Sequence, residues 1–163
     1  MKRLAGYAVI AVFAAPLPAA LLAAGSAAAA PNDVALTATA SGSTVAATIT
    51  NNTGTDLFCM VYGTTPGTNP EVDPIAFSAG LGDKLSGGAL DPVTIPAGGG
   101  PLTFPYVAVG EYQVDWACAN NYSGQPGHEE WGTTSAISAN ATAEPVLVTV
   151  SAAAPSWPSI FGS

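Results

Sequence analysis

Apolar side chains recur at every second position in several short runs of this chain, and the clearest run spans 111–118. One face of that run would carry Tyr112, Val114, Trp116 and Cys118, and the other Glu111, Gln113, Asp115 and Ala117. The run 44–50 repeats the pattern, with Val45, Ala47 and Ile49 on one side. Because side chains alternate between the two faces of a strand, this pattern predicts strands with one buried face.

The rest of the chain beyond residue 31 also favours strands and turns over helices. It is rich in Thr, Val, Gly, Pro, Asn and Ser and poor in Lys, Arg and Glu. The run 56–62 is apolar on both faces and is expected to be central, and 120–132 is expected to be a polar loop. Seven to nine short strands separated by turns predict an all-β sandwich or barrel. We expect these strands at 34–40, 44–50, 56–62, 75–78, 93–95, 102–109, 111–118, 136–139 and 145–150.

The first 29 residues have the three parts of a secretory signal peptide. Lys2 and Arg3 precede an apolar stretch over 4–24, and small residues follow over 25–30. We expect cleavage near 27–29, a β-sandwich domain over 30–151 and a flexible tail over 152–163. The alternative is an uncleaved membrane anchor, since the apolar stretch approaches the roughly 20 residues that span a bilayer. Pro16, Pro18 and the alanine-rich exit favour cleavage, and the mature chain has no second long apolar run.

Loss of the leader makes the mature chain strongly acidic. Of the three basic residues only Lys84 remains, against eleven acidic ones, which gives a net charge of −10 and leaves no arginine. Nucleic acid is therefore not an expected ligand, because binding it depends on Lys and Arg that neutralise phosphates. Anionic membrane surfaces are disfavoured for the same reason. The acidic surface is compatible with cationic partners or with a simple solvated exterior.

The chain contains two cysteines, Cys59 and Cys118. An even number of cysteines in an exported chain predicts a disulfide. This bond would close a loop of about 60 residues and contribute about 4 kcal/mol in the chain-entropy model. Free thiols or a redox pair are the alternative, but the sequence has no Cys-x-x-Cys motif.

Two sequence motifs carry a resemblance to a known family. Gly110-Glu111-Tyr112-Gln113-Val114-Asp115-Trp116-Ala117-Cys118 resembles the Gly-x-Tyr-x-Val run of many immunoglobulin-like domains, whose tyrosine often forms a corner and is followed by a cysteine. Thr48-Ile49-Thr50-Asn51-Asn52-Thr53-Gly54 is similar to a strand-to-turn run of bacterial immunoglobulin-like modules. The alanine-rich leader and the ending Phe161-Gly162-Ser163 resemble small exported proteins of actinobacteria. The resemblance implies an immunoglobulin-like antiparallel β-sandwich but no activity. Cys59 falls on about the third strand rather than the second, so the sheet pairing of the disulfide stays open.

The residues offer little for catalysis or metal binding. His128 is the only histidine, and no Gly-x-Ser-x-Gly elbow accompanies it. Glu129 and Glu130 are adjacent, so they would point to opposite sides of an extended chain, although Asp115 could act as a distant carboxylate partner. The acidic residues Asp73, Asp83, Asp91, Glu129 and Glu130 do not have the spacing of a calcium loop. We expect no enzyme, no metal and no cofactor.

Binding residues are expected in the polar loop and in the tail. Tyr122 and Trp131 flank the acidic part of the loop, with His128 and Glu129 between them, and Trp157 lies in the tail. Such aromatic side chains could anchor a partner, or fold back over the end of the sandwich. The expected function is a non-catalytic secreted or envelope-associated binding protein for a protein or envelope component. The alternatives are a small secreted hydrolase using His128 or acidic residues, and a carrier of a small ligand such as a lipid.

Overall fold

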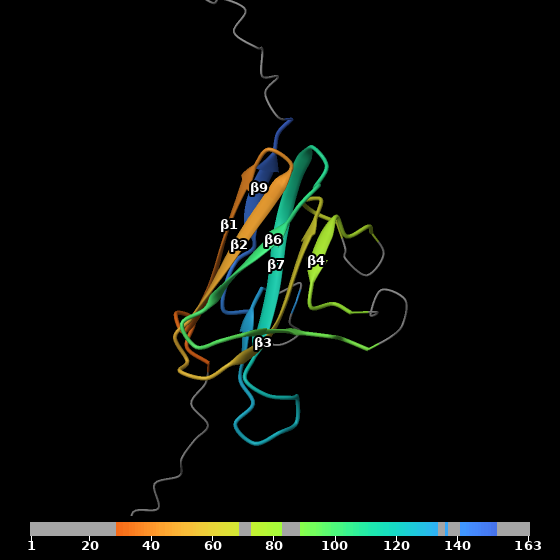
Figure 1. Cartoon of the computed structure of the whole chain (residues 1–163). Helices are drawn as coiled ribbons and strands as arrows, with labels where there is room; N and C mark the ends of the chain where they lie inside the picture. The colour runs from red at the N-terminus through yellow and green to blue at the C-terminus, as the bar shows by residue number, and fades with distance from the viewer. Residues whose placement is uncertain (1–28, 69–72, 83–88, 134–135, 137–140, 153–163) are drawn as a thin grey trace, which may run out of the picture.

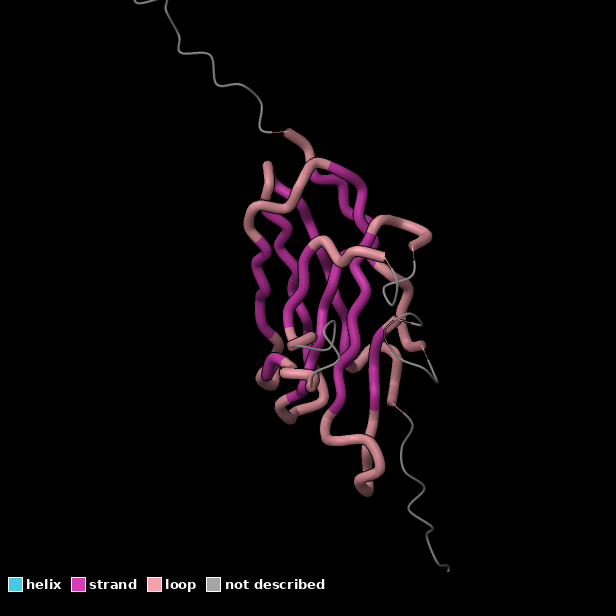
Figure 2. The backbone as a smooth tube through the Cα atoms, turned by 90° about the vertical axis from the view of Figure 1, so that its right-hand side faces the viewer, coloured by secondary structure: helices cyan, strands magenta, loops and turns pink. Residues whose placement is uncertain are grey.

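The computed structural model describes residues 29–68, 73–82, 89–133, 136 and 141–152. Within these ranges the chain forms two antiparallel sheets and no helix. Figure 2 shows the strands arranged in two layers. The strands are β1 (Val34–Ser41), β2 (Thr44–Asn51), β3 (Leu57–Thr64), β4 (Phe77–Ala79), β5 (Val93–Ile95), β6 (Gly100–Phe104), β7 (Gly110–Ala119), β8 (Glu130–Gly132) and β9 (Val146–Val150).

The smaller sheet has the order β1-β2-β6, and the larger is built around the central pair β3 and β7. The outer edge of β3 is shared by two short strands, with β5 opposite 57–59 and β4 opposite 61–63. The outer edge of β7 is divided in the same way, with β9 opposite 110–114 and β8 opposite 117–119. The long strands β3 and β7 therefore form the frame of the larger sheet (Figure 1).

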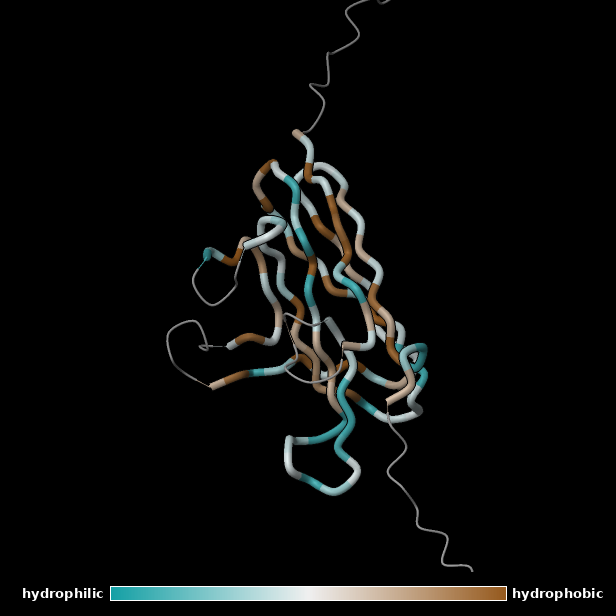
Figure 3. The backbone as a smooth tube through the Cα atoms, turned by 180° about the vertical axis from the view of Figure 1, so that it is seen from behind, coloured by the Kyte–Doolittle hydropathy of each residue, from teal (hydrophilic) through white to brown (hydrophobic). Residues whose placement is uncertain are grey.

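The apolar positions of the alternating runs face the space between the sheets, as the sequence predicts. Val45, Ala47 and Ile49 of β2 are fully buried, and so are Val114 and Trp116 of β7. Figure 3 shows the corresponding change between hydrophobic and hydrophilic colours along the strands. Burial of these side chains contributes about 1.5–3 kcal/mol for each large one, so the core is the main source of stability. The all-β sandwich prediction is confirmed.

Two motifs that the sequence singled out have defined structural roles. The Tyr112 hydroxyl donates to the Ala108 carbonyl oxygen at 3.0 Å, four residues upstream, which is the hydrogen bond of a tyrosine corner. Asn51 is 1% exposed, and its Nδ2 donates to the carbonyl oxygens of Thr55 at 2.8 Å and Pro96 at 3.0 Å. Its Oδ1 accepts from the backbone N–H and the hydroxyl of Thr53. Asn51 thus ties the β2–β3 turn to the β5–β6 loop.

Cys59 and Cys118 form a disulfide, as predicted, with Cα atoms 4.1 Å apart. They are directly paired residues of β3 and β7, so the bond lies within the larger sheet. In antibody-type domains the corresponding bond joins the two sheets. The chain departs from that pattern because its first cysteine is on a strand of the same sheet as the second.

Some strand boundaries differ from the sequence-based expectation. The expected loop 120–132 ends earlier, because Trp131 packs into the core and its neighbours pair with β7 as β8. The expected strand 102–109 begins at Gly100 and ends at Phe104, since Pro105 is followed by Tyr106 with a left-handed φ of 60°. The expected strand at 75–78 lies instead at Phe77–Ala79. Of the expected strand 136–139 only residue 136 is described, and it lies in a turn.

The expected signal peptide falls outside the described residues, apart from its last expected position, Ala29, which packs against the core. The tail is described only at residue 152. No helix in the described part of the chain is long and apolar enough to cross a membrane.

Candidate functional site

The candidate site lies on the outer face of the larger sheet, at the end where the 120–129 loop emerges. The strand register pairs Phe58 with Ala119 and Ala119 with Glu130. Their chain neighbours Cys59, Cys118 and Trp131 belong to the buried core. Because alternate residues of a strand face opposite sides, Phe58, Ala119 and Glu130 form one row across β3, β7 and β8 on the outer face.

Tyr122 from the loop stacks on Phe58 at one end of this row. The ring centroids are 5.7 Å apart and the ring planes are inclined by 17°. Phe58 is 36% exposed and Tyr122 is 72% exposed, so the pair presents aromatic surface to solvent. An offset stack of this kind is a favourable aromatic geometry, worth about 0.5–1.5 kcal/mol beyond the area it buries. The stack gives Tyr122 a preferred position although it belongs to a loop.

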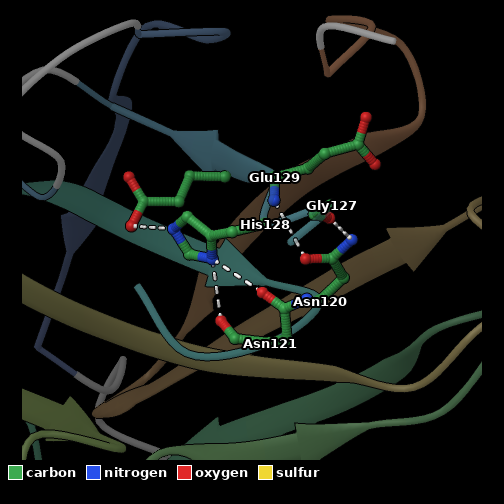
Figure 4. Close-up of polar contacts among 6 residues, drawn as sticks. Asn120, Asn121, Gly127, His128 and Glu129 are labelled. Atoms are coloured by element: carbon green, nitrogen blue, oxygen red, sulfur yellow. Dashed lines mark hydrogen bonds and ion pairs between the residues drawn. The ribbon is translucent and has the colours of Figure 1, made fainter. Parts of the chain in front are cut away.

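Asn120 closes the base of the loop. Its Oδ1 accepts from the backbone N–H of Glu129 at 2.9 Å, and its Nδ2 donates to the carbonyl oxygen of Gly127 at 2.9 Å (Figure 4). Gly127 has a φ of 72°, a left-handed conformation that glycine adopts without strain. These contacts define the path of the loop on either side of Tyr122.

His128 links the loop to β8. Its Nδ1 lies 2.9 Å from the carbonyl oxygen of Asn121 and 3.0 Å from that residue's Oδ1 (Figure 4). Its Nε2 lies 3.0 Å from Oε1 of Glu130. Both ring nitrogens thus lie within hydrogen-bond distance of oxygen atoms. The side chain of His128 is 18% exposed, and that of Glu130 is 39% exposed.

The contacts of His128 differ from those of the histidine in a serine-type triad. A serine-type triad places a hydroxyl on one side of the imidazole and a carboxylate on the other. Here Glu130 occupies the carboxylate side, but the other side faces only the amide and carbonyl oxygens of Asn121, and neither oxygen is a nucleophile.

Asp115, the possible distant carboxylate partner, is buried in the larger sheet. It is 1% exposed, and its two oxygens accept from the Thr133 hydroxyl at 2.7 Å and from Nε2 of Gln113 at 2.9 Å. A carboxylate held in this way cannot reach a glycosidic bond in solvent. Within the described ranges, no three His, Cys, Asp or Glu side chains lie close enough together to hold a metal ion.

The structure separates the residues that the sequence proposed for binding. Tyr122 and His128 belong to one ordered loop. Trp131 is 1% exposed and packs in the core, where its indole N–H donates to the carbonyl oxygen of Ala30 at 3.1 Å. Its indole is therefore closed to a surface ligand, as in the fold-back alternative. The side chain of Glu129 points away from His128 (Figure 4). Trp157 lies outside the described residues.

Sequence reasoning did not propose Phe58 or Glu130 as binding residues. Phe58 and Cys59 are adjacent in one strand, so their side chains point to opposite faces of the sheet. An inward Cys59 could therefore have indicated an outward aromatic side chain at Phe58. The strand 56–62 is apolar on both faces, however, so the pattern indicated a central strand and not an exposed face.

The described surface is electrostatically one-sided. Its residues include no lysine or arginine, and Lys84 lies outside the described ranges. The acidic residues within those ranges are Asp33, Asp56, Asp73, Asp91, Glu111, Asp115, Glu129, Glu130 and Glu144. The charge of these residues therefore disfavours an anionic ligand relative to a neutral or cationic one.

A hollow lies toward the other end of the larger sheet. Its volume is about 180 Å³, and it is lined by Pro66, Glu111, Tyr112, Leu147, Val148 and Thr149. Pockets for small organic ligands usually measure about 300–1,000 Å³, so this hollow is small for a lipid. The outward aromatic stack is the stronger candidate site.

Comparison with known proteins does not assign the chain to a family. No family model matches the chain, and no curated protein sequence matches it.

Proposed function

We propose that this chain is a non-catalytic exported binding protein whose ligand docks on the aromatic face, the surface formed by Phe58, Tyr122, Ala119, His128 and Glu130. The observation that carries the proposal is the stack of Tyr122 on Phe58. Exposed aromatic side chains held in a fixed position are typical anchors of binding surfaces, because they offer large contact area and lose little conformational entropy on binding.

Two further observations support the proposal. His128 and Asp115, the residues on which a hydrolase would depend, are engaged in hydrogen bonds within the protein, and Asp115 is buried. The disulfide between Cys59 and Cys118 suits an oxidising compartment, as does the signal-peptide pattern of the first 29 residues. A secreted or envelope-associated location is part of the proposal.

The binding role can be tested by nuclear magnetic resonance on the mature chain. The isotope-labelled protein is titrated with three probes of different charge: chitohexaose, soluble peptidoglycan fragments and hexalysine. We expect at least one probe to shift the backbone signals of 58, 119–122 and 128–130 selectively. Shifts confined to other surfaces, or no shift with any probe, would contradict the assignment of the site.

A matched pair of variants tests the role of the stack itself. Tyr122→Ala removes an exposed ring from the aromatic face, and Leu147→Ala removes an exposed apolar side chain, 70% accessible, from β9 of the same sheet. Binding should weaken in the first variant and not in the second.

The hydrolase alternative has its own test. The wild-type chain and His128→Ala are assayed on ester and glycoside substrates. Turnover that is lost with the histidine would overturn the non-catalytic proposal.

A further inference from the structure

We infer that the ligand of the aromatic face is cationic, namely a lysine- or arginine-bearing peptide segment of a partner protein. This inference rests on the proposed function and adds the chemical class of the ligand to it. It depends on two observations, the π surface of the Phe58–Tyr122 stack and the Glu130 carboxylate in the same row, and the charge of the surrounding residues agrees with both.

The first observation concerns the faces of the aromatic rings. Tyr122 is 72% exposed, and its ring covers Phe58 in a stacked geometry, so the outer face of a two-ring stack is open to solvent. The face of an aromatic ring carries partial negative charge and attracts lysine and arginine, with about 0.5–1 kcal/mol at exposed sites. Arginine can in addition stack its planar guanidinium on the ring.

The second observation is the carboxylate at the other end of the same row. Glu130 lies two strands away from Phe58, and strands are about 4.8 Å apart, so the two backbones are separated by about 10 Å. Between them Ala119 contributes only a methyl group. A cationic side chain lying over Ala119 would have the stack on one side and the Glu130 carboxylate on the other.

His128 orients the carboxylate of Glu130 and leaves it accessible. The contact between Nε2 and Oε1 is 3.0 Å, and 39% of the Glu130 side chain remains exposed. The carboxylate of Glu130 is already ordered. Pairing with a cationic ligand would therefore cost less side-chain entropy at Glu130 than at a free surface glutamate.

The charge of the surrounding surface acts in the same direction. The described residues carry no lysine or arginine, so His128 is the only basic side chain in the described part of the chain that contacts Glu130. An excess of acidic side chains also raises the association rate of a positively charged peptide, and this effect falls with ionic strength. A neutral glycan could stack on Tyr122, but it would make no use of this field.

The test measures binding of fluorescent hexalysine and hexaarginine to the full mature chain at low and at near-physiological ionic strength. Tyr122→Ala and Glu130→Gln should each weaken binding about two- to five-fold, as expected for one exposed cation–π contact or one exposed ion pair. Tyr122→Phe keeps the ring and should retain affinity. Thermal melting of each variant shows that it is folded.

Glu111→Gln is the matched control. Glu111 is exposed on the outer face of β7, the strand that also contains Ala119. The two residues are eight positions apart, which is about 27 Å at 3.4 Å per residue. The substitution removes the same charge from the protein, so only a localised site distinguishes it from Glu130→Gln. Equal losses in the two variants would mean unspecific attraction and would overturn the inference.

Two outcomes separate this inference from the proposed function. If chitohexaose binds in a manner that depends on Tyr122 and the cationic peptides do not, the cationic ligand is wrong and the aromatic face remains a binding site. If the peptides, chitohexaose and the peptidoglycan fragments all fail to bind at this face, both proposals fall.

Discussion

Cys59 and Cys118 lie directly opposite one another on β3 and β7, so the disulfide connects neighbouring strands of one sheet. Their backbones remain paired on both sides of the bond, at Phe58 with Ala119 and at Met60 with Ala117. The bond therefore reinforces an existing ladder and does not join the two sheets.

Removal of this bond should lower stability without changing the fold. The double variant Cys59→Ala, Cys118→Ala should lose about 3–4 kcal/mol of unfolding free energy, because its unfolded chain is no longer closed into a loop of 59-residue separation. Denaturant unfolding measures the loss. Mass mapping without reduction should show the Cys59–Cys118 peptide pair, and recovery of two free thiols would refute the pairing.

Tyr112→Phe should destabilise the protein by about 1 kcal/mol. The substitution removes the hydroxyl that donates to the Ala108 carbonyl oxygen and leaves that acceptor without this partner, while the ring keeps its packing against Phe77. The matched control is Tyr122→Phe, whose hydroxyl belongs to an exposed side chain. Equal melting temperatures for Tyr112→Phe and the wild type would argue against a stabilising corner.

Asn51→Ala should cost more than either tyrosine change, about 2–4 kcal/mol. The buried amide of Asn51 bonds to Thr53, Thr55 and Pro96, and its loss leaves polar groups of two loops unpaired. Asn52→Ala alters the exposed neighbour and serves as the control. Chemical denaturation compares the two variants, and similar values for both would show that the amide contacts contribute little.

Tyr106→Gly should stabilise the protein by about 0.5–1 kcal/mol. Tyr106 has a φ of 60° and is 91% exposed, so its side chain contributes little packing and its backbone is strained. Glycine relieves a strain of about 1–2 kcal/mol, which exceeds the roughly 0.5–1 kcal/mol that its greater freedom in the unfolded chain costs.

The control for this gain is Val109→Gly. Val109 is also exposed, at 67%, but is not among the residues with positive φ, so glycine should destabilise there. If both substitutions lower the melting temperature, the strain at Tyr106 is small.

Long alternating runs were the part of the fold that could be predicted well. The strands expected at 34–40, 44–50 and 111–118 match β1, β2 and β7 to within one or two residues. The three-residue strand β8 was missed, because so short a segment shows no periodicity and its pairing depends on the burial of Trp131. The end of β6 at Phe104 depends on the backbone at Tyr106, which no local pattern specified.

The candidate site was predicted only in part. Tyr122 and His128 were identified because they stand out in a polar loop. Phe58 was not, because it lies 64 positions before Tyr122 and the two rings meet only through the pairing of β3 with β7. Trp131 looked like a loop residue in the sequence, and its burial follows from the same pairing on the other edge of β7.

The sequence by itself determined the class of the fold, the inward faces of the long strands, the pairing of the only two cysteines and the acidity of the chain. These properties depend on local periodicity and on composition. The tertiary structure alone decided that the disulfide lies within one sheet, that Tyr122 stacks on Phe58, and that Glu130 faces the same side. The physical reason is that contacts between distant strands depend on register and on long-range packing, which the alternation of side chains within one strand does not encode.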